Sequence, residues 1–355
     1  MKVKQITEPT PQIPSIQRLK HWIIENPLHA FFLIGITISF STLFPALIFI
    51  SPNNSSGQLL SFYLGKIGVY SPVLTGILIE RIIRPQKSTT PTRNIPVTLS
   101  IWLISVIILI ASLKLTAPPQ LSLFILIVIS IPAALLPAFV ISSAISGTDG
   151  VKKMLETLIK PKGEIRYYLI ALLTFPIIHI VGTGITNILD GNTLLPEISQ
   201  IKDLILTVLI TFFSVLLYSG GINEESGWRG FAQKRLQTKY SPLISNLILW
   251  FLMVIWHIPN DLIQYQNGNY IFIRFVLYPC IAVLFGWVYN RTNGSILAPA
   301  IFHASMNSMN PLVNVFPVTY AGSIILITLT MLVIISNQMW RKLPEQHDAV
   351  YHEIY

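Results

Sequence analysis

Residues 97–115 read VTLSIWLISVIILIASLKL, and only Lys114 carries a charge in this stretch. An apolar segment of about 20 residues is long enough to cross the hydrocarbon core of a bilayer as a helix. Nine more segments have this character: 28–50, 58–80, 121–144, 167–188, 204–222, 242–258, 270–289, 295–311 and 317–336. The sequence therefore predicts an all-α polytopic membrane protein with about ten transmembrane helices.

The composition excludes an ordinary soluble protein. Of 355 residues, 11% are charged and 52% are hydrophobic, whereas about a quarter of a soluble domain is charged. The single cysteine, Cys280, excludes a disulfide framework and a cysteine-based zinc site. Residues 1–27 are polar and lack the apolar core of a secretory signal, so we expect them to remain as a tail.

The basic residues indicate an orientation. If the ten spans are correct, 20 of the 24 Lys and Arg lie on one side, in the two tails and in alternate loops. The positive-inside rule then places both termini in the cytoplasm, at the plasma membrane if the source is bacterial. Topology thus accounts for the net charge of +9, and we expect no nucleic-acid partner. Lys66 and Arg274 fall inside spans, have no acidic partner nearby in sequence, and are expected to reach towards the outer interface.

One segment carries two adjacent acids next to a span. Residues 219–230 read SGGINEESGWRG. On a helix, Glu225 and Arg229 are four residues apart in the order that favours an ion pair. Glu224 projects about 100° away from Glu225 and is left free to act as a base or ligand. The alternative is a solvated helix start with two acids near the positive end of the helix dipole.

Three histidines, His179, His257 and His303, lie within spans or at their ends. Taken singly, each is better explained as a hydrogen-bonded interior residue than as a catalyst. His303 differs because Asn307 lies one helical turn later on the same face. The pair could hold a developing oxyanion, or His303 could bind a metal with the amide as its support.

Together these residues resemble the type II CAAX prenyl endopeptidases and their bacterial relatives, the CPBP or Abi family of intramembrane proteases. The family pattern is Glu-Glu-x-x-x-Arg, then Phe-x-x-x-His, then His-x-x-x-Asn or Asp, on successive helices. Met253 stands where the family has Phe, which affects only the packing around the histidine. The resemblance covers roughly residues 170–337, and the matching positions are Glu224, Glu225, Arg229, His257, His303 and Asn307.

The resemblance implies an eight-helix catalytic core with additional N-terminal helices. We divide the chain into a cytoplasmic tail (1–27), N-terminal transmembrane helices (28–165), the CPBP-like core (166–337) and a second cytoplasmic tail (338–355). The implied function is hydrolysis of a peptide bond in a membrane-associated substrate, either CAAX-like or a precursor peptide. Glu224 and His257 would activate water, and His303 with Asn307 would polarise the scissile carbonyl. Membrane lipid and this peptide are the expected partners, and nothing indicates an oligomeric state.

The sequence leaves the role of a metal open. The family is commonly classed among the metalloproteases, and Glu224, His257 and His303 would provide the donor set of a hydrolytic Zn²⁺ site. If Glu224 is instead the general base, only two histidines remain as obvious ligands, and a Glu–His pair can activate water without metal. We keep both mechanisms as hypotheses.

Depth in the membrane presents a difficulty for this site. A sixth span of about 20 residues would bring Glu224 near the cytoplasmic surface, whereas His257, some 15 residues into its helix, would lie about 22 Å deep. We expect the Gly220-Gly221 segment to place the two acids below the interface, in a water-filled cavity open to the cytoplasm. The substrate would then enter from the cytoplasmic side.

Two other functions are compatible with the sequence. The chain could be a non-catalytic membrane scaffold or a bacteriocin-immunity protein of the same fold, although the complete Glu, His, His and Asn set favours an enzyme. A transporter is less favoured because no paired discontinuous repeats are visible.

Overall fold

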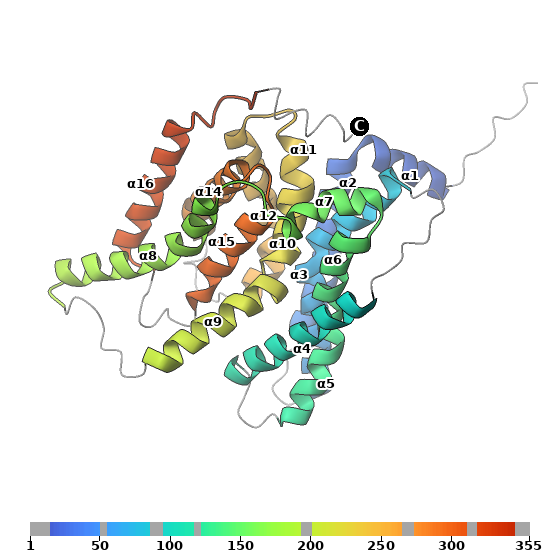
Figure 1. Ribbon diagram of the computed structural model, residues 1–355, viewed down its shortest axis with the longest axis horizontal. Helices are drawn as coiled ribbons and strands as arrows, with labels where there is room; N and C mark the ends of the chain where they lie inside the picture. Colours follow the sequence, from blue (N-terminus) through green and yellow to red (C-terminus); the bar gives the residue numbers. More distant parts are fainter. Residues whose placement is uncertain are drawn as a thin grey trace, which may run out of the picture.

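The computed structural model describes residues 15–49, 55–85, 95–116, 122–192, 201–264, 273–310 and 318–344, and within these ranges every regular element is helical (Figure 1). The elements are α1 (Ser15–Glu25), α2 (Pro27–Phe49), α3 (Ser55–Ile83), α4 (Ile95–Thr116), α5 (Leu123–Ala133), α6 (Leu135–Ser146), α7 (Asp149–Ile159), α8 (Ile165–Leu189), α9 (Ile201–Tyr218), α10 (Ile222–Gly227), the π-helix η1 (Trp228–Gln233), α11 (Lys234–Leu236), α12 (Pro242–Gln264), the π-helix η2 (Ile273–Leu277), α14 (Tyr278–Arg291), α15 (Leu297–Ser308) and α16 (Tyr320–Ser336).

The helices confirm a polytopic membrane protein. Within the described ranges, eight segments are long and apolar enough to span a membrane, and they coincide with the first eight predicted spans. The ninth and tenth predicted spans coincide with the shorter helices α15 and α16. Twelve residues of α15 rise only about 18 Å, which is too short for a complete crossing. The eight segments are Pro27–Ala46, Gly57–Ile83, Ile95–Leu115, Leu123–Ser146, Ile165–Leu189, Asp203–Leu236, Pro242–Leu262 and Ile273–Arg291.

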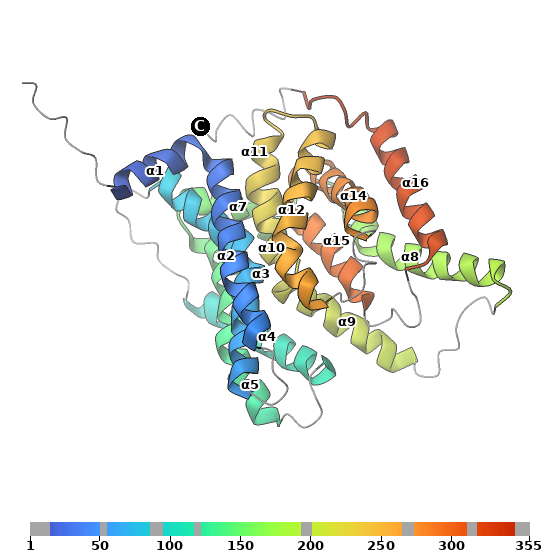
Figure 2. The same cartoon turned by 180° about the vertical axis from the view of Figure 1, so that it is seen from behind.

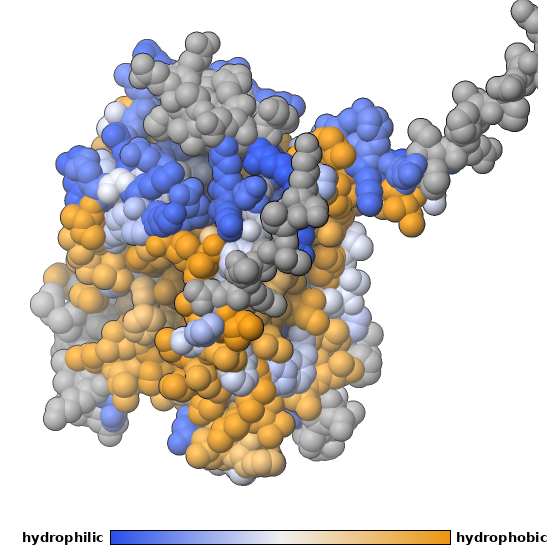
Figure 3. Space-filling view, turned by 45° about the vertical axis from the view of Figure 1, so that its right-hand side comes forward, coloured by the Kyte–Doolittle hydropathy of each residue, from blue (hydrophilic) through white to orange (hydrophobic). Residues whose placement is uncertain are grey.

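The surface divides into a polar end and an apolar flank. Figure 3 shows a band of hydrophilic residues at the top of the molecule and a largely hydrophobic surface below it. Helices α1, α7 and α11 lie at the top in Figure 1 and carry six basic residues, and we call this the basic end. Along α8, large apolar side chains such as Ile165 and Leu169 are exposed, as expected for lipid contact. The six basic residues are Arg18, Lys20, Lys152, Lys153, Lys234 and Arg235.

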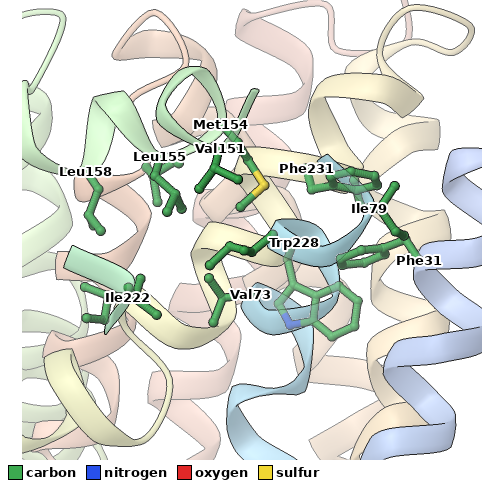
Figure 4. Close-up of a cluster of buried hydrophobic side chains, with 14 of the residues drawn as sticks. Phe31, Val73, Ile79, Val151, Met154, Leu155, Leu158, Ile222, Trp228 and Phe231 are labelled. Atoms are coloured by element: carbon green, nitrogen blue, oxygen red, sulfur yellow. The ribbon is translucent and has the colours of Figure 1, made fainter. Parts of the chain in front are cut away.

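One apolar core joins the N-terminal helices to the helices that carry the motif. Phe31 of α2 stacks on Phe231 of η1 with ring centroids 4.9 Å apart, and its edge meets Trp228 at 5.6 Å. Figure 4 shows these rings beside Met154 of α7. The first helices of the chain therefore pack directly against the Glu-Glu segment, and the division of the chain at residue 165 remains a prediction from sequence.

The sixth span is a bent helix rather than a straight one. Its first part, α9, runs obliquely (Figures 1 and 2) and ends at Tyr218. Gly220 has φ +142, a conformation that favours glycine, and α10 begins at Ile222. The helix then continues through η1 to Leu236, so Glu224 lies twelve residues, or about 18 Å, from that end. A straight sixth span that ends at residue 222 would have brought Glu224 near the membrane surface, but the described helix bends at Gly220 and continues past Glu224.

Candidate active site

The six residues predicted from the motifs come from four helical segments and line one cavity of about 670 Å³. α10 contributes Glu224 and Glu225, η1 contributes Arg229, α12 contributes His257, and α15 contributes His303 and Asn307. His179 lies on α8 and is not among the described residues that line this cavity.

Glu225 is the centre of a buried charge network. Arg229 Nε donates to Glu225 Oε2 at 2.9 Å, and His303 Nδ1 lies 2.9 Å from Glu225 Oε1. Arg229 also donates from Nη1 to Gln233 Oε1 at 2.9 Å, and its guanidinium lies over the Phe285 ring. The ion pair between Glu225 and Arg229 is present as the spacing indicated. Both carboxylate oxygens of Glu225 are therefore engaged, one with Arg229 and one with His303.

Glu224 has a different environment. It is buried beside Glu225, and its Oε2 has no hydrogen-bond partner among the residues that the structure describes. A buried carboxylate oxygen without a partner is uncommon, and a catalytic role is one explanation for it. Glu224 is therefore available for a proton or a substrate group, as its position on the helix suggested.

Both histidines have one ring nitrogen fixed by an acceptor. His257 Nδ1 lies 2.7 Å from the backbone oxygen of Met253, which can only accept, so Nδ1 carries the proton. Replacement of the family's Phe by Met253 leaves this backbone contact in place. His303 Nδ1 faces the Glu225 carboxylate in the same way. In their neutral forms, both rings therefore present Nε2 as a hydrogen-bond acceptor.

Gly220 approaches His303 more closely than the sequence indicated. A Cβ on Gly220 would lie 2.3 Å from His303 Nε2, so only glycine fits here. Its backbone N–H donates to Asn223 Oδ1 at 3.0 Å, and Asn223 Nδ2 donates to Val69 O at 3.0 Å. In the sequence, the Gly220-Gly221 pair before the two acids pointed to a close backbone contact. It did not show that the His303 imidazole is the neighbour.

Arg274 has an acidic partner that is distant in sequence, whereas its expected reach towards the outer interface stays a prediction. Arg274 Nε donates to Asp261 Oδ2 at 2.6 Å, Nη2 donates to Oδ1, and both side chains are buried. The guanidinium lies 4.1 Å from the centroid of the Tyr278 ring. Asp261 is at the end of α12 and Arg274 is in η2, so the partners meet only when the two helices pack. Arg274 also lines the cavity.

Lys66 is half-buried, and its expected reach towards the outer interface stays a prediction. Its ammonium lies over the rings of Phe62 and Tyr218, 5.4 and 5.6 Å from their centroids. Contacts with aromatic faces stabilise a cation where water is scarce.

The proposed metal donors match zinc in chemistry but do not converge. Glu224 offers an unpaired oxygen, and each histidine presents Nε2 while an acceptor holds Nδ1, as in many metal-binding histidines. However, among the described residues no three His, Cys, Asp or Glu side chains lie close enough together to hold an ion. The mechanism proposed below therefore contains no metal-dependent step.

A family comparison supports the resemblance seen in the motifs. Residues 205–309 match the family model described as type II CAAX prenyl endopeptidase Rce1-like. We call residues 205–309 the Rce1-like segment, after the family model that it matches. All three motif blocks fall inside this segment, and the family resemblance predicted from sequence is confirmed.

A curated relative agrees with this assignment. The chain is 29% identical over 100 residues to the protein named CAAX prenyl protease 2 of Methanococcus maripaludis. This alignment covers 26% of the present chain and spans 37% of the length of that relative. The Rce1-like segment therefore contains all six motif residues, whereas α1 to α8 lie outside the matched region.

Proposed function

We propose that the chain is an intramembrane endopeptidase that hydrolyses a peptide bond in a membrane-associated substrate, either CAAX-like or a precursor peptide. The observation that carries the proposal is the meeting of all six motif residues in one cavity between apolar helices. A solvated helix start would leave the two acids exposed, but Glu224 and Glu225 are 4% and 0% exposed.

In the proposed mechanism, Glu224 and His257 activate a water molecule. Glu224 accepts a proton from the water through its unpaired oxygen, and His257 Nε2 accepts the second hydrogen bond and orients the nucleophile. The water oxygen attacks the scissile carbonyl, and the carbon–oxygen double bond opens to a tetrahedral oxyanion. When the intermediate collapses, the carbon–nitrogen bond breaks and Glu224 returns the proton to the leaving amine.

His303 and Asn307 would stabilise the oxyanion. The Asn307 amide can donate directly, whereas His303 can donate from Nε2 only when its ring is doubly protonated, because Nδ1–H is already directed at Glu225. Glu225 would stabilise that imidazolium and Arg229 would hold Glu225 in place. In this scheme Glu225 and Arg229 are positioning residues rather than groups that touch the substrate.

The proposal can be tested with purified protein in lipid nanodiscs. The probes are a quenched fluorescent peptide with a farnesylated CAAX terminus and the same peptide without the lipid. Glu224→Gln and His257→Ala should each lower the cleavage rate about 10²- to 10⁴-fold, the contribution of general acid–base catalysis. Glu164→Gln and His21→Ala, at exposed positions, serve as matched controls and should cleave normally.

The same assay with and without a zinc chelator separates the two mechanisms. Loss of cleavage on substitution but not on chelation supports water activation by Glu224 and His257 alone. Loss on chelation, with recovery when Zn²⁺ is added, supports a metal mechanism in which Glu224, His257 and His303 are the ligands. Equal cleavage by all variants would refute the site, and no cleavage by any folded form would favour the scaffold or immunity alternative.

A further inference from the structure

A second cavity, of about 380 Å³, shares no described lining residue with the candidate active site. It lies where the spans Ile165–Leu189 and Pro242–Leu262 begin and the span Ile273–Arg291 ends, and residues just beyond α16 complete its wall. Beyond α16 the chain runs along the top of the molecule in Figures 1 and 2. Residues at the ends of spans lie near the boundary between hydrocarbon and headgroups. This cavity, which we call the interfacial cavity, is therefore at the depth of lipid headgroups.

The wall of the interfacial cavity is fixed by contacts between distant segments. Gly163 has φ +79, and a Cβ there would lie 2.6 Å from Thr292 Cα, so the connection before α8 packs directly on the end of α14. On another side, the Leu243 N–H donates to Met339 O at 3.0 Å, which joins α12 to the segment after α16. A cavity held by backbone contacts is already formed before a ligand arrives, as most small-molecule sites are.

Arg291 brings a positive charge to this cavity that its partner does not neutralise. Arg291 Nε donates to Asn337 Oδ1 at 3.0 Å, and Nη2 donates to the same oxygen. Trp287 Nε1 also donates to this oxygen, at 3.2 Å. One neutral amide oxygen thus receives three donors, although it has two lone pairs. An anion with several oxygens satisfies such donors more fully, and the guanidinium fork matches the geometry of phosphate.

The other polar groups of the described lining leave this charge in excess. Glu164 and Arg166 pair with each other, with Oε1 and Nη2 2.8 Å apart, so their charges cancel and the net charge of the described lining is that of Arg291. Asn290 Oδ1 is buried and has no hydrogen-bond partner among the described residues. It can accept from a hydroxyl or ammonium group. The lining therefore fits a ligand that carries both a phosphate and such a donor.

The surroundings of the interfacial cavity indicate that this ligand is a lipid. The Tyr167 and Trp287 rings meet edge to face with centroids 5.8 Å apart, and these two residue types are enriched at the level of the headgroups. Ile165, at the start of α8, and Ile335, near the end of α16, are 73% and 58% exposed. Apolar surface for acyl chains thus lies on two of the helices whose ends form the cavity.

We propose that the interfacial cavity binds the headgroup of a membrane phospholipid. The phosphate accepts hydrogen bonds from Arg291 and Trp287, and a headgroup hydroxyl or ammonium group donates to Asn290. The acyl chains extend over the exposed apolar side chains of α8 and α16. This site is separate from the candidate active site, and the proposal does not depend on the peptidase function.

Native mass spectrometry of the full chain tests the site without relying on activity. The protein is stripped of lipid in detergent and titrated with phosphatidylglycerol, or with diacylglycerol that has the same acyl chains and no phosphate. We expect the native protein to retain phosphatidylglycerol and to bind diacylglycerol about tenfold more weakly, because the contact between guanidinium and phosphate is then missing.

Asn337→Asp is the decisive variant. It places a carboxylate where Arg291 now faces an amide of the same size, so it neutralises the guanidinium and repels a phosphate. We expect phosphatidylglycerol to bind about 10- to 100-fold more weakly, without a lower Tm in detergent. Arg291→Gln, at an exposed position, should have a similar effect on binding. Arg341→Gln, also exposed and absent from the described lining, is the matched control and should bind as the native protein does.

Several outcomes would overturn the proposal. Equal binding of phosphatidylglycerol by the native protein and by Asn337→Asp would exclude a phosphate site at Arg291, as would equal retention of diacylglycerol. Displacement of the lipid by an equal concentration of inorganic phosphate would identify a soluble anion as the ligand. Binding that arises only after removal of residues 345–355, which carry three acids, would show that these residues occupy the cavity in place of a lipid.

Discussion

The candidate site depends on contacts between single atoms. Glu225 receives one hydrogen bond from Arg229 and one from His303, each at 2.9 Å, so a change at any of the three disturbs the other two. Gly220 lies against the opposite nitrogen of the same imidazole. His303 is thus hydrogen-bonded to a carboxylate at Nδ1, and its ring packs closely beside the backbone of Gly220, so it has little freedom to rotate.

Gly220→Ala should inactivate the protein through this contact. The new Cβ would fall 2.3 Å from His303 Nε2, at a residue with φ +142, so either the ring or the backbone must move. A displacement of about 1 Å in a catalytic group can lower the rate about 10²-fold. The measurement is the cleavage rate of the fluorescent peptide in nanodiscs.

Gly65→Ala is the matched control for this prediction. A Cβ on Gly65 meets nothing within 4 Å, and alanine is favoured over glycine inside a helix such as α3. This variant should cleave at the native rate. Equal rates for the two variants would contradict the close packing of Gly220 on His303.

At the level of elements, buried polar contacts connect α12 to α3 and to η2. Ser71 of α3 lies 2.8 Å from Trp256 Nε1, and the Trp256 ring packs edge-on against His257. Near the end of the same helix, Asp261 binds Arg274 of η2. The helix that presents His257 is therefore held by both an N-terminal helix and the following span.

Asp261→Asn should lower stability markedly. The substitution removes the carboxylate charge that faces the buried Arg274 guanidinium, and breaking a buried ion pair costs about 3–5 kcal/mol. We expect a lower Tm in detergent, measured by the fluorescence of the intrinsic tryptophans. The double variant Asp261→Leu/Arg274→Met removes both charges and should recover most of the loss, since an apolar pair of similar size is often as stable as the ion pair.

The control for these variants is the ion pair of Glu164 and Arg166. Their side chains are 63% and 64% exposed. Glu164→Gln should change Tm little, because exposed ion pairs contribute at most about 1 kcal/mol. A small change for Asp261→Asn, comparable with that of Glu164→Gln, would show that the buried pair contributes little to the fold.

At the scale of the whole molecule, the N-terminal helices and the Rce1-like segment form one packed unit. The cluster around Phe31 and Trp228 draws residues from α2, α3, α7, α10 and η1. Leu43 of α2 and Val69 of α3 also line the cavity. Helices outside the matched region therefore contribute both to the core and to the wall of the candidate site.

Removal of residues 1–94 should consequently prevent folding, although all six motif residues remain. The truncated chain would expose the apolar faces of Trp228, Phe231 and Met154, which pack against α2 and α3 in the full chain. We expect it to elute as an aggregate in size-exclusion chromatography, without cleavage activity. Co-expression of residues 1–94 as a separate fragment should restore a monodisperse complex. A monodisperse, active truncated chain would contradict the shared core.

Local patterns were sufficient to predict part of the site. Glu225 and Arg229 are four residues apart on one helix, so their pairing follows from helical geometry. Hydropathy similarly located the eight long spans, because their apolar length is a local property of the chain. The pairing of Asp261 with Arg274 could not be found in this way, since it requires the end of α12 to meet η2 across an intervening connection.

By itself, the sequence determined the membrane class, the approximate span boundaries and the motif residues, because each of these depends on the local order of apolar and polar side chains. Only the tertiary structure decided that the sixth span bends at Gly220 and that Glu225 binds His303 from a helix 78 residues away. These features depend on close packing between distant segments. The residue pattern of one segment does not specify which distant segment will pack against it, or where.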